Sequence, residues 1–206
     1  MSVVGIVPAG GSGERLGADR PKAFVVCAGR PLFQWSVDAL EPACDRLIVA
    51  APPSHLRPGW VEGGPSRSAS VRNALDAAAE ATIVIIHDAA RPLVTPDLVA
   101  RCLDALDGVD GVIAATPVAD TVHVASEHLI RETPDRSTLW AAQTPQVFRA
   151  DVLRNAYDSN KEATDEASLV AAVGGTVRLV EGPSDNIKVT TPTDLRLAEA
   201  LLRERC

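Results

Sequence analysis

Short apolar runs rich in β-branched residues alternate with helix-like segments along this chain, and this alternation constrains its fold more than any other feature. Residues 3–7 form one such run, and the clearest one, residues 82–86, leads directly into His87 and Asp88. Runs that stay apolar at nearly every position suit strands buried on both faces of a parallel sheet. We therefore expect an α/β fold, with a mostly parallel sheet flanked by helices.

The rest of the pattern agrees with this alternation. It places further strands at residues 46–50, 111–115 and 176–181, and helices at residues 32–40, 66–80, 96–106, 151–157, 165–173 and 192–203. Residues 120–125 and 128–133 alternate polar and apolar side chains, which predicts a β-hairpin that is too polar for the core. We expect one domain over residues 1–206, from which the hairpin protrudes as an arm at about residues 120–135.

The composition disfavours several classes of protein. The 206 residues are enough for one sizeable core, and 27 acidic against 20 basic residues give a net charge of −7, which argues against a general grip on nucleic acid. No apolar stretch has the length of a membrane span, and residues 1–7 lack the basic start of a signal peptide. The four cysteines show no metal-binding spacing, which indicates reduced thiols. We expect a cytoplasmic protein without nucleic-acid or membrane partners.

A glycine-rich loop over residues 8–17 follows the first strand, shortly before Pro21 and Lys22. Glycines let successive backbone N–H groups point inward, as they do in sites for polyphosphates. A P-loop is excluded because no glycine in this segment precedes a lysine. Three alternatives stay open: a dinucleotide loop, which lacks its acidic partner after the second strand; a loop without a ligand; and a nucleoside triphosphate loop with Arg15 and Lys22.

Three further segments carry candidate chemistry. Asp88 follows the clearest strand, at the sheet edge where α/β proteins bind ligands, and either holds Mg²⁺ with substrate phosphates or pairs with Arg91. His87 is expected to be a core histidine. Residues 63–70 place a glycine pair before a helix with short hydroxyls, suited to a base, a ribose or an ordinary cap. Lys188, in a strand-like run at residues 185–190, is one of only three lysines, which favours a functional role.

Together these segments resemble one known family, the 2-C-methyl-D-erythritol 4-phosphate cytidylyltransferases of the non-mevalonate isoprenoid pathway. The matching stretches follow the family order over nearly the whole chain: 8–16, 21–22, 63–64, 87–92, 120–121, 143–146, 164–168 and 185–190. The resemblance implies a Rossmann-like nucleotidyltransferase fold and transfer of CMP from CTP to methylerythritol phosphate with release of pyrophosphate. It also implies Mg²⁺ as a cofactor and a homodimer formed through the hairpin arm. Pro65 is a departure, since relatives often carry Asp beside the base.

The resemblance implies roles for individual residues. The CTP site would be formed by Pro8, Ala9, Gly10, Gly11, Gly13, Gly64, Ser70, Asp88 and Ala89, with Asp88 also beside the metal ion. Arg15 and Lys22 would stabilise charge in the transition state, and Arg136 and Lys188 would aim the attacking phosphate. The methylerythritol phosphate site would comprise Thr121, Arg136, Thr144, Thr164 and Lys188.

The residue types in these segments also suit nucleotidyl transfer, independently of the resemblance to the family. A phosphate monoester is mostly ionised at pH 7, because its second pKa is about 6, so nucleotidyl transfer needs cations and alignment rather than a general base. Two other functions stay open. One is a cytidylyltransferase for another polyol phosphate, such as ribitol 5-phosphate, and the other is a nucleotide-binding module without turnover.

Overall fold

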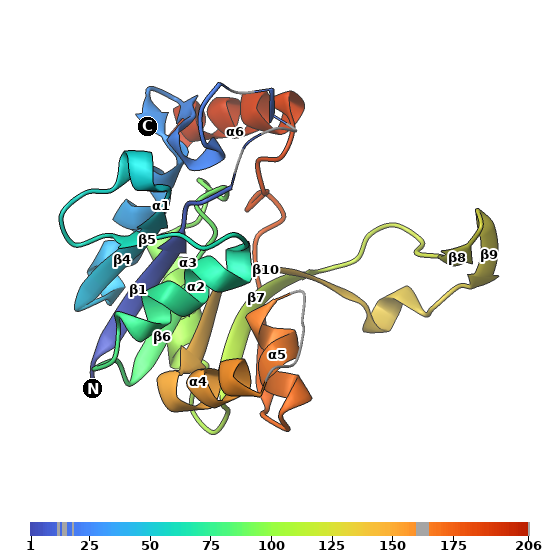
Figure 1. The fold of residues 1–206 in the computed structure, drawn as a ribbon. Coiled ribbons are helices and arrows are strands. Elements are labelled where there is room, and N and C mark those ends of the chain that lie inside the picture. The colour runs from blue at the N-terminus through green and yellow to red at the C-terminus, as the bar shows by residue number, and fades with distance from the viewer. Residues whose placement is uncertain (12, 14–15, 18, 160–164, 206) are drawn as a thin grey trace.

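The computed structural model describes residues 1–11, 13, 16–17, 19–159 and 165–205. Its centre is a seven-stranded sheet in the order β11-β7-β10-β6-β1-β4-β5 (Figure 1). These strands are β1 (Val3–Pro8), β4 (Arg46–Ala51), β5 (Val61–Glu62), β6 (Ile83–Ile86), β7 (Gly111–Pro117), β10 (Trp140–Arg149) and β11 (Val177–Glu181). Every neighbouring pair is parallel except the two that include β10, which runs antiparallel to both β6 and β7. The expected mostly parallel sheet is confirmed.

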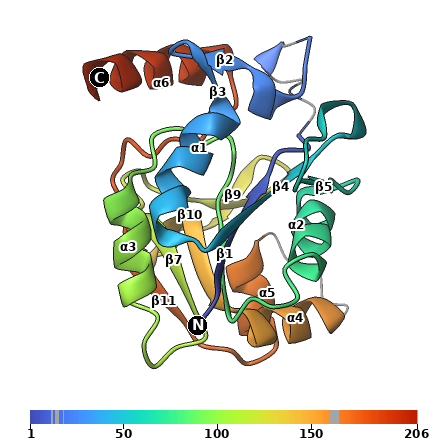
Figure 2. The same ribbon diagram turned by 90° about the vertical axis from the view of Figure 1, so that its left-hand side faces the viewer.

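Helices cover both faces of this sheet (Figure 2). On one face, α1 (Leu32–Leu40) and α3 (Pro96–Asp104) pack against strand residues such as Val7 and Ile85. On the other face, α2 (Arg67–Asp76), α4 (Ala150–Asp158) and α5 (Glu166–Ala172) pack against residues such as Ile6 and Ile86. Adjacent residues of a strand point to opposite faces, so a strand covered on both sides must be apolar at each position. This double cover explains the continuous apolar runs.

A third, smaller apolar cluster lies beyond the carboxyl ends of the parallel strands. Here α6 (Pro192–Arg205) contributes Ala198 and Leu202, which pack with Leu32 and Val189. Two short strands, β2 (Val26–Cys27) and β3 (Arg30–Pro31), pair with each other beside it. The cluster fixes residues 187–189 next to the sheet edge where ligands of α/β proteins bind. Within the residues described, no helix has both the length and the apolar character to cross a membrane.

The structure corrects three expectations. The sequence pattern does not predict β10, because Gln143, Thr144, Pro145 and Gln146 interrupt its apolar character, and the register shifts between Ala142 and Gln146. α2 ends at Asp76 instead of residue 80, and the chain turns towards β6 through bonds such as Ala78 N–H to the Leu75 carbonyl. Residues 185–190 form no strand. In that segment the Val189 N–H donates to the Ala90 carbonyl, and this bond is not part of a β-sheet.

The expected hairpin is present and projects from the body of the molecule (Figure 1). β8 (Val124–Ser126) pairs with β9 (Leu129–Glu132) in a separate two-stranded sheet, so both strands are shorter than the sequence predicts. All residues of the two strands are exposed, including the apolar side chains of Val124, Leu129 and Ile130. The chain leaves the central sheet after β7 and re-enters it as β10.

Candidate active site

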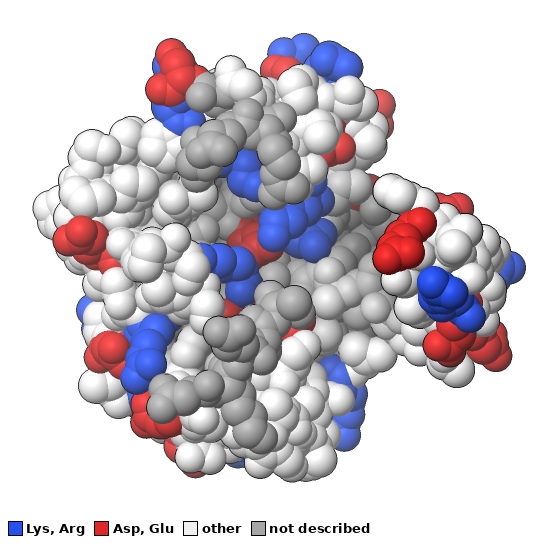
Figure 3. All heavy atoms as spheres, turned by 45° about the vertical axis from the view of Figure 1, so that its right-hand side comes forward, with Lys and Arg blue, Asp and Glu red and all other residues white. Residues whose placement is uncertain are grey.

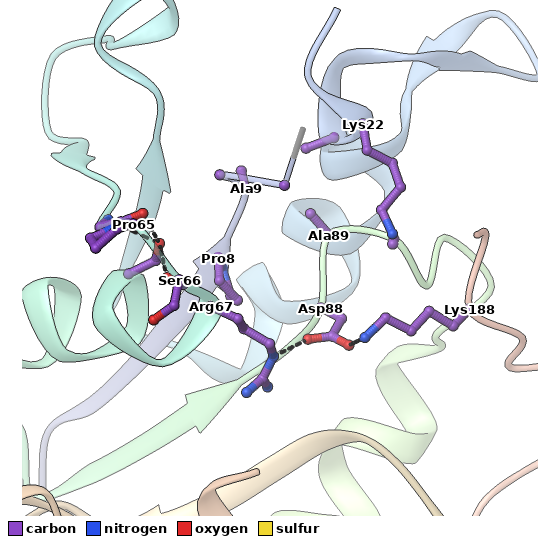
Figure 4. A pocket seen from close by; sticks show the side chains of 15 residues that line it. Pro8, Ala9, Lys22, Pro65, Ser66, Arg67, Asp88, Ala89 and Lys188 are labelled. Atoms are coloured by element: carbon purple, nitrogen blue, oxygen red, sulfur yellow. Dashed lines mark hydrogen bonds and ion pairs between the residues drawn. The ribbon is translucent and has the colours of Figure 1, made fainter. Parts of the chain in front are cut away.

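A pocket of about 350 Å³ lies at the carboxyl ends of the parallel strands β1 and β6 (Figures 3 and 4). Most of the predicted site residues line it, namely Pro8, Ala9, Gly10, Gly11, Lys22, Gly64, Ser70, Asp88, Ala89 and Lys188. They come from four separate parts of the chain, which the parallel topology brings to one sheet edge. The sequence-based interpretation of these segments as one site therefore agrees with their positions.

The glycine-rich loop forms one wall of the pocket. The Lys22 N–H donates to the Gly11 carbonyl at 3.0 Å, which folds the loop back on itself and brings Lys22 to the pocket. Gly13 has a φ of +81°, a backbone conformation that disfavours residues with a Cβ. Gly13 belongs to this loop but does not line the pocket, and Arg15 lies outside the described residues.

The opposite wall is the start of α2. The Ser66 hydroxyl accepts from the Ala69 N–H at 3.1 Å and caps the helix, so the ordinary capping role of Ser66 is confirmed. The buried Ser70 hydroxyl donates to the Ser66 carbonyl at 2.9 Å and accepts from the Gly64 N–H at 3.0 Å. A Cβ on Gly64 would lie 2.9 Å from the carbonyl carbon of Ala69. Gly64 is therefore packed directly on the first turn of the helix.

Asp88 lies at the floor of the pocket, and each of its carboxylate oxygens faces a different cation. Oδ1 is 2.8 Å from Arg67 Nε, and Oδ2 is 2.6 Å from Lys188 Nζ (Figure 4). Burial alone would raise the pKa of Asp88, but Arg67 and Lys188 outweigh it and hold that pKa well below its ordinary value. Asp88 is therefore an ionised carboxylate, although its side chain is only 8% exposed.

Arg91 does not pair with Asp88 in the way one sequence alternative proposes. Its guanidinium instead donates to the carbonyls of Asn186, at 2.7 Å, and Ala142, at 3.3 Å. These contacts tie the end of β6 to the segment that carries Lys188 and to β10. Arg91 therefore has a structural role beside the site, through these backbone contacts.

His87 is fully buried beneath Asp88, as expected for a core histidine. The Asp88 N–H donates to Thr144 Oγ1 at 3.1 Å, and Thr144 Oγ1 lies 3.0 Å from His87 Nδ1. His87 Nε2 lies 3.1 Å from the Arg91 carbonyl, which only accepts, so Nε2 carries the ring proton and the Thr144 hydroxyl donates to Nδ1. Burial lowers the pKa of His87 to about 4 and keeps it neutral.

Two charged residues of the site are missed by the sequence interpretation. Arg67 lines the pocket, and its Nη1 lies 2.9 Å and 2.8 Å from the two carboxylate oxygens of Glu166. The only local signal is that Arg67 is the first residue of α2, where the helix dipole disfavours a cation unless a carboxylate compensates it. Glu166 is separated from Arg67 by 99 positions, so no local pattern joins the two.

The remaining predicted site residues lie apart from the pocket or outside the described residues. Thr121 and Arg136 are exposed on the arm, where Arg136 donates to the Ala119 carbonyl at 2.6 Å. Thr144 is buried, with its hydroxyl engaged by Asp88 and His87. Thr164 falls outside the described residues. The pocket of one chain thus contains Lys188 but neither Thr121 nor Arg136.

Asp88 is the candidate metal ligand. Across the part of the chain that is described, no three or more His, Cys, Asp or Glu side chains are grouped as a metal site. Asp88 nevertheless fits a magnesium ion bound mainly by a triphosphate, because Mg²⁺ commonly takes one or two carboxylates and completes its shell with phosphate oxygens and water. Asp88, ionised at the floor of the pocket, can supply this carboxylate ligand.

The sheet topology and the glycine-lined, cation-bearing pocket define a Rossmann-like α/β nucleotidyltransferase. Residues 3–204 match the family model IspD, 2-C-methyl-D-erythritol 4-phosphate cytidylyltransferase. The chain belongs to this family.

Individual relatives agree with the family assignment. A 2-C-methyl-D-erythritol 4-phosphate cytidylyltransferase of Synechococcus sp. (strain CC9902) is 44% identical over 97% of this chain and 97% of its own length. That of Nocardia farcinica (strain IFM 10152) is 44% identical over 99% of this chain and 95% of its own. The crystal structure of the enzyme from Thermus thermophilus superposes with a TM-score of 0.84 at 38% identity, covering 98% of this chain and 100% of that one.

Proposed function

We propose that the pocket between the glycine-rich loop, α2 and Asp88 is the site at which this chain carries out its family's reaction. The chain is a CTP-dependent cytidylyltransferase that transfers CMP to 2-C-methyl-D-erythritol 4-phosphate, for isoprenoid precursor biosynthesis. One observation carries the assignment of the site. Lys22 and Lys188, two of the three lysines, enter the same glycine-walled pocket from elements far apart in the sequence (Figure 4).

The nucleotide half of the site lies between the loop and α2. Backbone groups at Ala9, Gly10 and Gly64 would bind the cytosine and ribose. These residues have a small side chain or none, which leaves room for a flat ring beside the backbone. Lys22, together with Arg15, would stabilise the charge that develops on the α-phosphate and on the departing pyrophosphate. Pro65 also lines the pocket and has no side-chain donor or acceptor for the base.

The acceptor half would be formed around Lys188. Its ammonium lies at the pocket, where it can align the phosphate of methylerythritol phosphate for attack on the α-phosphate of CTP. That phosphate is already ionised at pH 7, so the buried and neutral His87 is not needed as a base. Thr121, Thr164 and Arg136 would complete this half.

Asp88 would hold a magnesium ion together with the triphosphate oxygens. The ion would supply positive charge on the phosphates of CTP. The Asp88 oxygens each face one cation, and a carboxylate oxygen has room for a second partner.

The arm supports a proposal of assembly as a homodimer. An isolated two-stranded hairpin is marginally stable in water, yet this hairpin carries exposed Val124, Leu129 and Ile130. Packing of these side chains on a second copy would cover them and carry Thr121 and Arg136 to the neighbour's pocket.

We propose that residues 1–206 form one catalytic domain. Cys27, Cys44 and Cys102 are free, which suits the reducing cytoplasm.

The test is a pyrophosphate-release assay with CTP, Mg²⁺ and one acceptor at a time. Methylerythritol phosphate should support turnover, and ribitol 5-phosphate should support much less. Lys188→Met should raise the KM for the acceptor and lower kcat, while the Kd for CTP changes little. Release with ribitol 5-phosphate alone would favour the other polyol phosphate reaction. Release with neither acceptor would leave only a nucleotide-binding module.

A further inference from the structure

Four charged side chains and one phenol form a continuous chain of contacts from the pocket into the core. Lys188 contacts Asp88, Asp88 contacts Arg67, and Arg67 contacts Glu166. The Tyr157 hydroxyl donates to Glu166 Oε1 at 3.0 Å and ends the chain. The contacts join α2, the loop after β6, the start of α5, α4 and the segment that carries Lys188, so they connect both halves of the site.

Among these five contacting residues, only Arg67 contacts two carboxylates. Its Nε donates to Asp88 Oδ1 at 2.8 Å, and its Nη1 donates to both oxygens of Glu166. The planar guanidinium is suited to this, since its N–H groups are fixed along two edges, whereas a lysine ammonium is a single point of charge. Burial alone would lower the pKa of Arg67, but the two carboxylates outweigh it and raise the pKa above its ordinary value.

Glu166 anchors Arg67 on the side away from the pocket. The Glu166 side chain is only 2% exposed and is held by Arg67 and Tyr157 together. Burial, with Glu166 beside it, raises the pKa of Tyr157, so the phenol stays protonated and donates. Because Glu166 is buried, it fixes the Nη1 end of the Arg67 guanidinium. The guanidinium is rigid, so the position of its Nε is fixed as well.

We propose that Arg67 is a positioning residue for the acceptor phosphate, acting through Asp88 on Lys188. By holding Asp88 Oδ1, Arg67 sets the plane of the carboxylate and thereby the direction of Oδ2, to which Lys188 is bound. Without Arg67, the Asp88 carboxylate is free to rotate about its last bond and the Lys188 ammonium moves with it. A displacement of about 1 Å at an aligning group costs on the order of 10²-fold in rate. This inference rests on the proposed acceptor role of Lys188.

Removal of Arg67 alone is an ambiguous test, because it leaves Glu166 charged and buried without a cation. The informative variant is therefore the double substitution Arg67→Met with Glu166→Gln. It removes both charges, and the neutral amide still accepts a hydrogen bond from Tyr157. The double variant should unfold at a higher temperature than Arg67→Met alone. Its acceptor kinetics should stay impaired.

Arg72→Met is the matched control. Arg72 is on the same helix and also forms an ion pair, 3.2 Å from Asp158, but this pair is exposed and away from the pocket. This control should keep the kinetics of the wild type. Arg67→Lys should stay impaired, because a lysine cannot reach Asp88 and Glu166 at the same time.

The readouts are kcat and KM for methylerythritol phosphate, the Kd for CTP and the unfolding temperature. For the double variant we expect kcat/KM for the acceptor to fall on the order of 10²-fold. The Kd for CTP, titrated without Mg²⁺ so that movement of the proposed metal ligand Asp88 does not enter it, should change by less than about threefold, since Arg67 is assigned no direct bond to the nucleotide. Acceptor kinetics that recover along with the unfolding temperature would show a purely structural Arg67. A loss of CTP binding as large as the loss in acceptor kinetics would show a direct nucleotide contact.

Lys188→Met, measured in parallel, separates this inference from the proposed function. If Lys188→Met leaves the acceptor kinetics intact, the acceptor role of Lys188 fails and the inference fails with it. If Lys188→Met is impaired but the double variant is normal, only the inference about Arg67 is overturned.

Discussion

Lys22 is proposed to act through its charge, and its backbone also shapes the loop that forms one wall of the pocket. Its side chain lines the pocket, and its N–H closes the loop on Gly11. A cation that acts mainly on the transition state should affect turnover more than substrate binding. The backbone bond to Gly11 does not involve the Lys22 side chain, so Lys22→Ala removes the ammonium without removing the bond that closes the loop.

Lys22→Ala should lower kcat by about 10²–10³-fold, as is usual when one preorganised electrostatic donor is removed, and should weaken CTP binding less. Steady-state kinetics together with a CTP titration measure the two effects. Arg20→Ala is the control, because Arg20 is in the same loop but forms an exposed pair with Asp19. A Lys22 variant with normal kcat and only a raised KM would contradict this role.

The neutral His87 makes the stability of the protein depend on pH. Its pKa is about 4 in the folded chain and 6.5 in an ordinary environment. Above about pH 6.5 the residue is neutral in both states, and its contribution to stability is complete. Between pH 6.5 and 4 only the unfolded chain binds the proton, so stability falls as the pH falls.

The free energy of unfolding should therefore drop by about 2 kcal/mol from pH 7.5 to pH 5 on account of His87. Urea unfolding at the two pH values measures this drop. His87→Gln removes the titrating group, so its drop should be smaller by that amount, whatever its stability at pH 7.5. Equal drops in the two proteins would show that the pKa of His87 is not depressed.

At the scale of elements, the sequence predicts those strands and helices whose pattern of apolar and polar residues is regular. Strands such as β6 are apolar throughout because both of their faces are covered, and this pattern is local. β10 cannot be predicted in this way. Its buried Gln143, Thr144 and Gln146 and its proline argue against a central strand, and they are tolerated only because distant groups bond them.

The same distinction applies to the site. The glycine-rich loop and Asp88 are predictable, because each directly follows a strand whose carboxyl end lies at the ligand-binding edge. The contacts of Arg67 with Asp88 and Glu166 join residues 21 and 99 positions apart. Such pairs depend on how helices pack on the sheet, and no local spacing encodes them.

The contact between the Gly64 loop and α2 gives a prediction at this scale. Gly64→Ala should move the loop away from the helix, since the new Cβ would lie within 2.9 Å of the Ala69 backbone, and it should weaken CTP binding. Isothermal titration with CTP measures the effect, with thermal unfolding to confirm that the variant is folded. A folded variant with unchanged CTP affinity would place the base elsewhere.

At the scale of the whole molecule, the residues proposed for the acceptor site are divided between the pocket and the arm. Lys188 lines the pocket, whereas Arg136 lies in a short helical turn between β9 and β10. Figure 1 shows this part of the chain as a protruding arm. If the arm serves a neighbouring copy, Lys22 and Arg136 of the same chain act in different sites. Their separate losses can then be complemented.

A mixture of Lys22→Ala and Arg136→Ala proteins should recover activity after subunit exchange, because one site of each mixed dimer has both residues intact. Each variant alone, treated in the same way, should stay inactive. Mixed dimers confirmed by differential tagging that show no turnover would mean that Arg136 serves its own chain.

The arm begins and ends on neighbouring strands, since β7 and β10 are paired along most of their length. The sheet holds the two ends of the arm together, and the entropy cost of closing the intervening loop grows only with the logarithm of its length. Residues can be added to or removed from the tip of the arm without disturbing the pocket. Evolution can therefore alter the tip around residues 126–129, and with it the surface that the arm would offer a second copy, while Thr121 and Arg136 nearer the central sheet stay unchanged.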